Sequence, residues 1–115
     1  MTPEEHKALD GFVAAVRAHY GARLADILLF GSRARGDNDE DSDVDLAVIL
    51  QNADWEFWTE KRVLSDFALE GILAADLHIH AWPVSRASWD DPATDRDWRL
   101  IASMKEVAKS IATAA

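Results

Sequence analysis

Two apolar runs in the first half of the chain, residues 26–30 and 46–50, are joined by a turn and a strongly acidic loop. Short runs rich in Ile, Leu and Val between Gly, Ser and Asp residues predict strands. Asp43-Val44-Asp45 opens the second run. Because side chains alternate along a strand, both carboxylates are expected on the same side, about 6–7 Å apart. Two like charges at this spacing favour a cation between them.

The Gly31-Ser32 pair directly after the first run predicts a phosphate-binding turn. Gly31 lets the backbone approach a ligand closely, and free backbone N–H groups in such a turn can hold a phosphate. The Ser32 hydroxyl can donate to a phosphate oxygen, and Arg35, or less strongly Arg33, can neutralise its charge as a fork donor. With the two carboxylates, these residues predict a site for a magnesium-bound nucleotide, because Mg²⁺ prefers carboxylate and phosphate oxygens.

Length and composition limit the other possibilities. The 115 residues are expected to form a single domain, 1–115, and 49% apolar with 29% charged residues is typical of a globular protein. The absence of cysteine excludes disulfides and zinc–thiolate sites. The acidic start differs from a signal peptide, and no apolar run approaches the roughly 20 residues of a membrane span, so we expect a cytoplasmic protein. A net charge of −9 argues against direct binding of nucleic acid through its phosphates.

The remaining pattern predicts a small α/β (α+β) fold. Thr2 as N-cap, Pro3 at the first helical position and Glu5 in a capping box predict the start of a helix that ends at Gly21. The further expected elements are strands over 25–30 and 43–50, a helix over 54–73, a strand over 76–84, a loop over 85–95 and a helix over 95–112. The order α-β-β-α-β-α predicts a mixed sheet of three to four strands with helices packed on it.

Gly31-Ser32, ten residues and then Asp43-x-Asp45 resembles the signature of the polymerase-beta-like nucleotidyltransferase superfamily. Within it, the chain looks like the minimal nucleotidyltransferase (MNT-type) proteins, many of which are antitoxins to HEPN-domain toxins. The stretch that matches closely is residues 27–50. The resemblance implies the polymerase-beta-like fold, the use of ATP with Mg²⁺ and the transfer of AMP to a partner protein in a hetero-oligomer.

The family takes a third carboxylate from a neighbouring strand, which here corresponds to residues 76–84. By strand parity Asp76, His78 and His80 share a face, and Asp76 is the only acid among them. We therefore assign Asp76, beside the other two aspartates, as a catalytic and metal-binding residue. If the strand register instead brings His78 to that position, the third acid is missing, and the protein would bind nucleotide with weak activity or none.

The leading hypothesis is an Mg²⁺-dependent nucleotidyltransferase that moves AMP from ATP to a hydroxyl, such as that of tyrosine, on a cognate HEPN-type toxin. Its first alternative is an antitoxin with a degenerate site that neutralises its partner by binding alone. The second is transfer to a small molecule such as an aminoglycoside, but such enzymes usually carry an additional helical domain.

Five tryptophans in 115 residues suggest an interface as well as a core. Trp89 and Trp98 flank an acidic segment, which is a candidate surface for a basic protein partner. The alternative interpretation is that the indoles serve packing.

Overall fold

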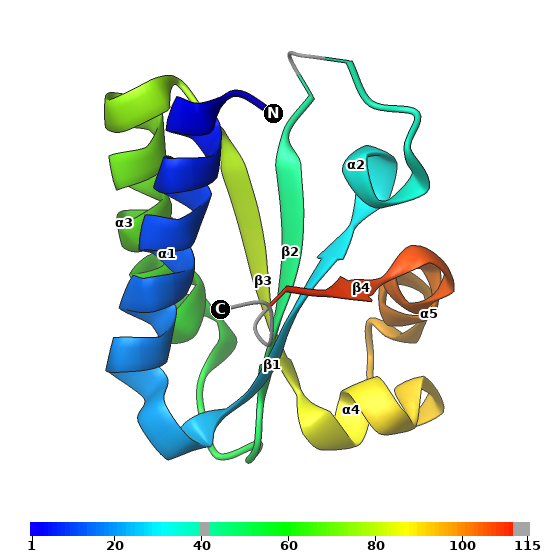
Figure 1. The fold of residues 1–115 in the computed structure, drawn as a ribbon. Helices are drawn as coiled ribbons and strands as arrows, with labels where there is room; N and C mark the ends of the chain where they lie inside the picture. Colours follow the sequence, from blue (N-terminus) through cyan, green and yellow to red (C-terminus); the bar gives the residue numbers. More distant parts are fainter. Residues whose placement is uncertain (40–41, 112–115) are drawn as a thin grey trace.

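A four-stranded mixed sheet lies between two layers of helices (Figure 1). This computed structural model describes residues 1–39 and 42–111. The strands are β1 (Leu24–Phe30), β2 (Val44–Leu50), β3 (Ile79–Ser85) and β4 (Lys109–Ser110), in the spatial order β3-β2-β1-β4. β2 is parallel to β3 and antiparallel to β1, and β4 is antiparallel to β1. The mixed α/β sheet predicted from the sequence is confirmed.

Two long helices cover one face of the sheet and shorter helices lie on the other (Figure 1). The long helices are α1 (Pro3–Tyr20) and α3 (Phe57–Ala75); the opposite layer contains α2 (Gly31–Arg35), α4 (Arg86–Asp90) and α5 (Trp98–Val107). Single 3₁₀ turns, η1 (Gly21–Arg23) and η2 (Pro92–Thr94), connect some of these elements. None of the helices in the described part of the chain has the length and apolar character needed to span a membrane.

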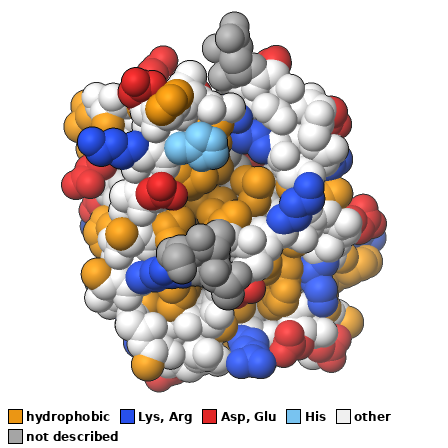
Figure 2. Space-filling view, viewed as in Figure 1, with side chains coloured by type: hydrophobic (Ala, Val, Ile, Leu, Met, Phe, Trp, Pro, Cys, Tyr) orange, Lys and Arg blue, Asp and Glu red, His pale blue; other side chains and the backbone are white. Residues whose placement is uncertain are grey.

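The two faces of β2 explain why its sequence is almost continuously apolar. Its alternate residues Val44, Leu46, Val48 and Leu50 are buried in one cluster with side chains of α1 and α3. The residues between them, Ala47 and Ile49, belong to a second cluster with Ile101 and Met104 of α5. A strand with both faces covered needs apolar residues at successive positions. On the face shown in Figure 2, apolar side chains gather between the helical layers, and charged side chains surround them.

The predicted start of the first helix is confirmed in detail. The Thr2 side chain accepts a hydrogen bond from the Glu5 backbone N–H at 3.1 Å, and a Glu5 side-chain oxygen accepts from the Thr2 N–H at 2.9 Å. These contacts form the capping box, and Pro3 occupies the first turn. Gly21 provides the C-cap.

The segment after α3 differs from its prediction. The third strand begins at Ile79 rather than at residue 76. Asp76 instead is the C-cap of α3, in the left-handed conformation with φ 52°. Its backbone N–H bonds to carbonyls of the last helical turn, so the residue closes the helix and is not part of the strand.

The C-terminal region also differs. The expected loop over 85–95 contains the short helix α4 and the turn η2. The expected helix over 95–112 covers only Trp98–Val107, and its predicted end at 112 lies outside the described residues. Lys109–Ser110 pairs with β1, and Ile111 N–H donates to the Ile27 carbonyl at 2.9 Å. Ile111 thereby packs on the α1/α3 cluster. In a continuous helix, Ile111 would lie about two turns after Met104 and on the same side of the helix, and Met104 faces the other cluster.

A buried hydrogen bond joins α1 to α3. Tyr20 Oη donates to Glu60 Oε1 at 2.9 Å, and the two residues are only 3% and 8% exposed. Burial raises the pKa of the Tyr20 phenol above its ordinary value, and the hydrogen bond to Glu60 adds to the rise. The folded protein therefore keeps the phenol protonated and the pair intact.

Tyr20→Phe is expected to lower the free energy of unfolding by about 1–3 kcal/mol, because it leaves a buried carboxylate without its donor. Glu60→Gln is the matched control; its amide oxygen still accepts the bond, so it should cost less. Because the Tyr20 pKa is higher in the folded than in the unfolded state, the stabilisation is present below a pH of about 10 and is lost as the pH rises above it. Urea unfolding at pH 8 and pH 11 measures this; equal stability of Tyr20→Phe and wild type at pH 8 would contradict it.

Candidate active site

The chain turns from β1 into α2 at a position that only glycine fits. Gly31 has φ +73°, in the left-handed region that side chains rarely adopt. A Cβ atom placed on it would lie 2.3 Å from Asp45 Oδ2. The preceding residue, Phe30, pairs with Asp45 across the β1–β2 ladder. The missing side chain thus lets the Gly31-Ser32 turn lie directly against a carboxylate.

The two carboxylates expected at the start of the second strand, those of Asp43 and Asp45, lie near His80. Asp43 directly precedes β2, Asp45 is its second residue, and the register pairs Asp45 with His80 of β3. His80 Nε2 lies 3.3 Å from Asp43 Oδ2. Burial raises the pKa of the Asp45 carboxyl; the charge of Asp43 also raises it, while His80 and Arg35 oppose the rise. The site therefore concentrates negative charge in a partly desolvated place, where a bound cation would be stabilised.

The two arginines of α2 have different environments. Arg33 donates from Nε and Nη2 to the Ser42 carbonyl at 3.0 and 2.8 Å, which ties the turn to the residue before Asp43. Arg35 Nε donates to Asp37 Oδ2 at 3.1 Å, and half of its side chain is exposed. Arg35 is therefore free to exchange an exposed ion pair for a ligand phosphate, whereas Arg33 supports the site through the backbone.

Asp76 does not join this group. It lies three residues before Ile79, the residue of β3 that pairs with Val44, and its side chain is 90% exposed. Its ion-pair partner is His78, at 3.4 Å. The expected common face of Asp76, His78 and His80 does not form, because the strand begins only at Ile79. The residue beside Asp43 is His80. The alternation of side chains predicted the face of the strand on which His80 lies, but it could not predict which residue of the neighbouring strand His80 would pair with.

The donor atoms fit a metal ion that arrives with a nucleotide rather than a preformed metal centre. Within residues 1–39 and 42–111, no group of three or more His, Asp or Glu side chains is arranged to hold a metal. Mg²⁺ is usually bound by one or two carboxylates together with substrate phosphates and water. Asp43 and Asp45 supply such a pair, beside a turn suited to phosphate.

Comparison with known proteins identifies the family. The sequence profile of the nucleotidyltransferase domain matches residues 9–106. The chain belongs to this family. The Gly31-Ser32 and Asp43-x-Asp45 motif lies within the matched residues.

Two relatives of this nucleotidyltransferase domain are proteins of Methanocaldococcus jannaschii that are named as candidate protein adenylyltransferases. One is 47% identical over 45 residues, covering 39% of this chain and 45% of the relative. The other is 41% identical over 71 residues, covering 62% and 48%. The chain thus spans about half the length of the curated relatives it matches.

Solved structures share the fold. A candidate nucleotidyltransferase from Sulfolobus solfataricus superposes with a TM-score of 0.53 at 16% identity, over 78% of this chain and 81% of that one. A toxin–antitoxin complex solved with AMP-PNP superposes with a TM-score of 0.52 at 19% identity, over 92% and 70%. Together with the mixed sheet, these similarities confirm the polymerase-beta-like fold expected from the motif.

Gly31→Ala tests the contact between turn and carboxylate, with Gly36→Ala as its matched control. Both glycines have positive φ, +73° and +85°, but a Cβ at Gly36 meets no atom within 4 Å. Gly36→Ala should cost about 1 kcal/mol from backbone strain alone. Gly31→Ala should cost more, because it must also displace the Asp45 carboxylate. Urea unfolding of both variants provides the measurement; equal losses would show that the close approach is absent in solution.

Proposed function

We propose that this domain is an Mg²⁺-dependent nucleotidyltransferase that transfers AMP from ATP to a hydroxyl group of a partner protein. The observation that carries the proposal is the close approach of the Gly31 backbone to Asp45, since it supports a turn that would bind phosphate beside the Asp43 and Asp45 carboxylates. The adenylyltransferase names of the Methanocaldococcus relatives support AMP transfer to protein. The ATP analogue in the toxin–antitoxin neighbour supports ATP as the nucleotide.

Each residue has a role that follows from its position. Gly31 and the Ser32 hydroxyl hold the terminal phosphates, and Arg35 neutralises their remaining charge. Asp43 and Asp45 would hold Mg²⁺, which makes the α-phosphorus more electrophilic and stabilises the charge of the leaving group. Without a cation the two carboxylates repel each other, so binding of the metal–nucleotide complex would remove an unfavourable interaction within the protein.

The reaction exchanges one phosphorus–oxygen bond for another. The acceptor hydroxyl oxygen attacks the α-phosphorus, the bond to the oxygen bridging the α- and β-phosphates breaks, and pyrophosphate leaves. The hydroxyl proton must pass to a base. His80 lies next to Asp43, and a neutral imidazole can accept this proton.

The partner we propose is a HEPN-type toxin, modified on tyrosine or another hydroxyl, with this domain as its antitoxin. The sequence resemblance described above and the toxin–antitoxin neighbour support this partner. Modification and contact would both silence the toxin.

One observation favours the alternative of an antitoxin that acts by binding alone. The side chain beside Asp43 is the imidazole of His80, and Asp76 is the C-cap of α3. Without a third carboxylate, the fold and the nucleotide site can persist while the chemistry is lost.

Labelled ATP, Mg²⁺ and the product of the adjacent gene distinguish these functions. Transfer of label to that protein should fall at least about 100-fold in Asp43→Ala and in His80→Ala, because each removes a group at the reacting atoms. His80→Asp should retain more activity than His80→Ala if His80 occupies the third-carboxylate position.

Asp76→Ala is the comparison that separates the two assignments of the third residue. Retained labelling in this variant supports His80 as the third residue of the site. A loss of labelling equal to that of Asp43→Ala would instead support Asp76 as that residue. Inhibition of the partner without any labelling, and unchanged in Asp43→Ala, would contradict the transferase and support binding alone.

A further inference from the structure

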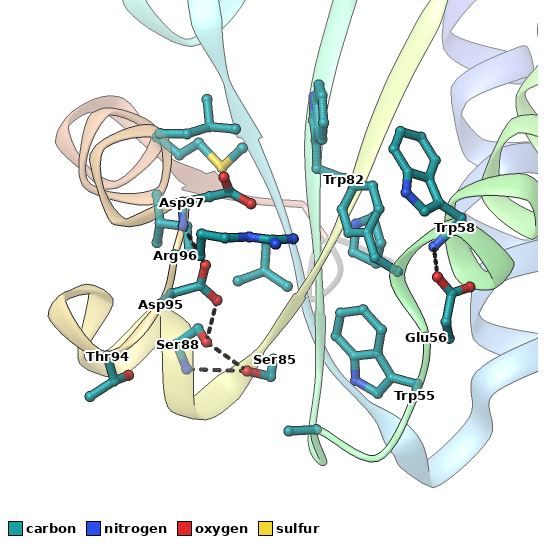
Figure 3. A pocket seen from close by; sticks show the side chains of 17 residues that line it. Trp55, Glu56, Trp58, Trp82, Ser85, Ser88, Thr94, Asp95, Arg96 and Asp97 are labelled. Atoms are coloured by element: carbon teal, nitrogen blue, oxygen red, sulfur yellow. Dashed lines mark hydrogen bonds between the residues drawn. The ribbon is translucent and has the colours of Figure 1, made fainter.

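A large open groove lies over the outer strand of the sheet, outside the turn and carboxylates described above. Its volume is about 820 Å³. One wall carries Trp55, Trp58 and Trp82, and the other carries Asp95, Arg96 and Asp97 (Figure 3). The wall residues come from the start of α3, from β3 and from the segment that leads into α5.

The groove begins next to the proposed active site. His80, Trp82 and Val84 are alternate residues of β3, so their side chains lie on one face of the strand. His80 contacts Asp43, while Trp82 and Val84 line the groove. Residues two apart on a strand are separated by about 6–7 Å. A chain lying in the groove can therefore place a side chain at the carboxylates.

The aromatic wall combines a fixed indole with an exposed one. Lys61 Nζ lies 4.7 Å from the centre of the Trp82 ring and donates to the Ala81 carbonyl at 2.6 Å. Trp58 is 71% exposed although it is a large apolar residue. Tryptophans exposed in a concave surface are typical anchors of protein–protein contacts.

The charged residues of the groove favour a cationic occupant. Glu56, Asp95 and Asp97 line it, against a single arginine, Arg96. Asp95 is held in place because its carboxylate accepts from Ser88 Oγ at 2.8 Å and from the Asp97 N–H at 2.7 Å. The whole chain has a net charge of −9, so its field attracts basic partners.

The geometry points to a docking site for the acceptor: we propose that the groove binds a basic segment of the partner protein through an aromatic or aliphatic side chain and presents its hydroxyl to the active site. This inference rests on the proposed transferase function and names the class of segment it modifies. The tryptophans that matter are those of the α3 and β3 wall; Trp89 packs on the α5 cluster, and Trp98 is not part of the groove. The acidic residues between them, Asp95 and Asp97, do line it.

The test measures binding to the full chain of a fluorescent peptide with one tyrosine flanked by arginine and leucine, and of a matched peptide with glutamate in place of arginine. The basic peptide should bind at least about tenfold more tightly, and more weakly as salt increases. Trp58→Ala should weaken it at least about tenfold. Trp98→Ala removes an indole that is also exposed, at 47%, but does not line the groove, and it should stay within twofold of wild type. Arg96→Gln should bind the basic peptide as tightly as wild type or more tightly.

Three results would overturn the proposal. Equal effects of Trp58→Ala and Trp98→Ala would remove the groove as the binding site. Weaker binding of AMP-PNP with Mg²⁺ in Trp58→Ala or Arg96→Gln would make a nucleoside the occupant. A wild-type dimer that Trp58→Ala converts to a monomer in sedimentation would make the occupant a second copy.

Failure of the groove and failure of the transferase are distinguishable. Peptide binding needs no nucleotide chemistry, so Asp43→Ala should bind the basic peptide normally while labelling nothing. Binding that depends on Trp58 in a protein that never transfers label would leave the docking site standing and remove the transferase. Labelling that depends on Asp43 and is unchanged by Trp58→Ala would support the transferase and remove the groove as the docking site.

Discussion

The close approach of the Gly31 backbone to the Asp45 carboxylate depends on the register between β1 and β2. That register pairs Phe30 with Asp45, and it is held by burial on both faces of β2. Shifting a strand by one residue moves every side chain to the opposite face, which here would bring aspartates into the α1/α3 core. The packing that stabilises the fold therefore also determines where the turn meets the acid.

The same arrangement has an electrostatic cost. Asp45 is partly desolvated and lies near Asp43, and both effects raise its pKa. His80 and Arg35 offset this only in part. A site that holds like charges together is stabilised when a cation binds, and this is the electrostatic basis of the metal-bound nucleotide that we propose for it.

The two faces of the sheet serve different purposes. The face against α1 and α3 is filled by long apolar side chains and supports the hydrogen bond between Tyr20 and Glu60. On the other face, α4 and α5 are short, and the surface of β3 beyond His80 stays open as the groove. Incomplete coverage of this face leaves a surface on the domain that could receive the proposed acceptor.

Local interactions are what the sequence by itself determined. Neighbouring residues determine the capping box at Thr2, the two apolar strands and the positions of Gly31-Ser32 and Asp43-x-Asp45 at the ends of those strands. The sequence pattern was therefore sufficient to predict these local structures. Tertiary structure decided the rest. Periodicity showed that His78 and His80 share a parity, but only the pairing of β3 with β2 placed His80 opposite Asp45, from where its side chain reaches Asp43. Lys109–Ser110 became a strand because it pairs with β1, which is distant in sequence. Asp76 closes α3 through hydrogen bonds to the last turn of that helix, a local contact that the alternating pattern of residues 76–84 concealed.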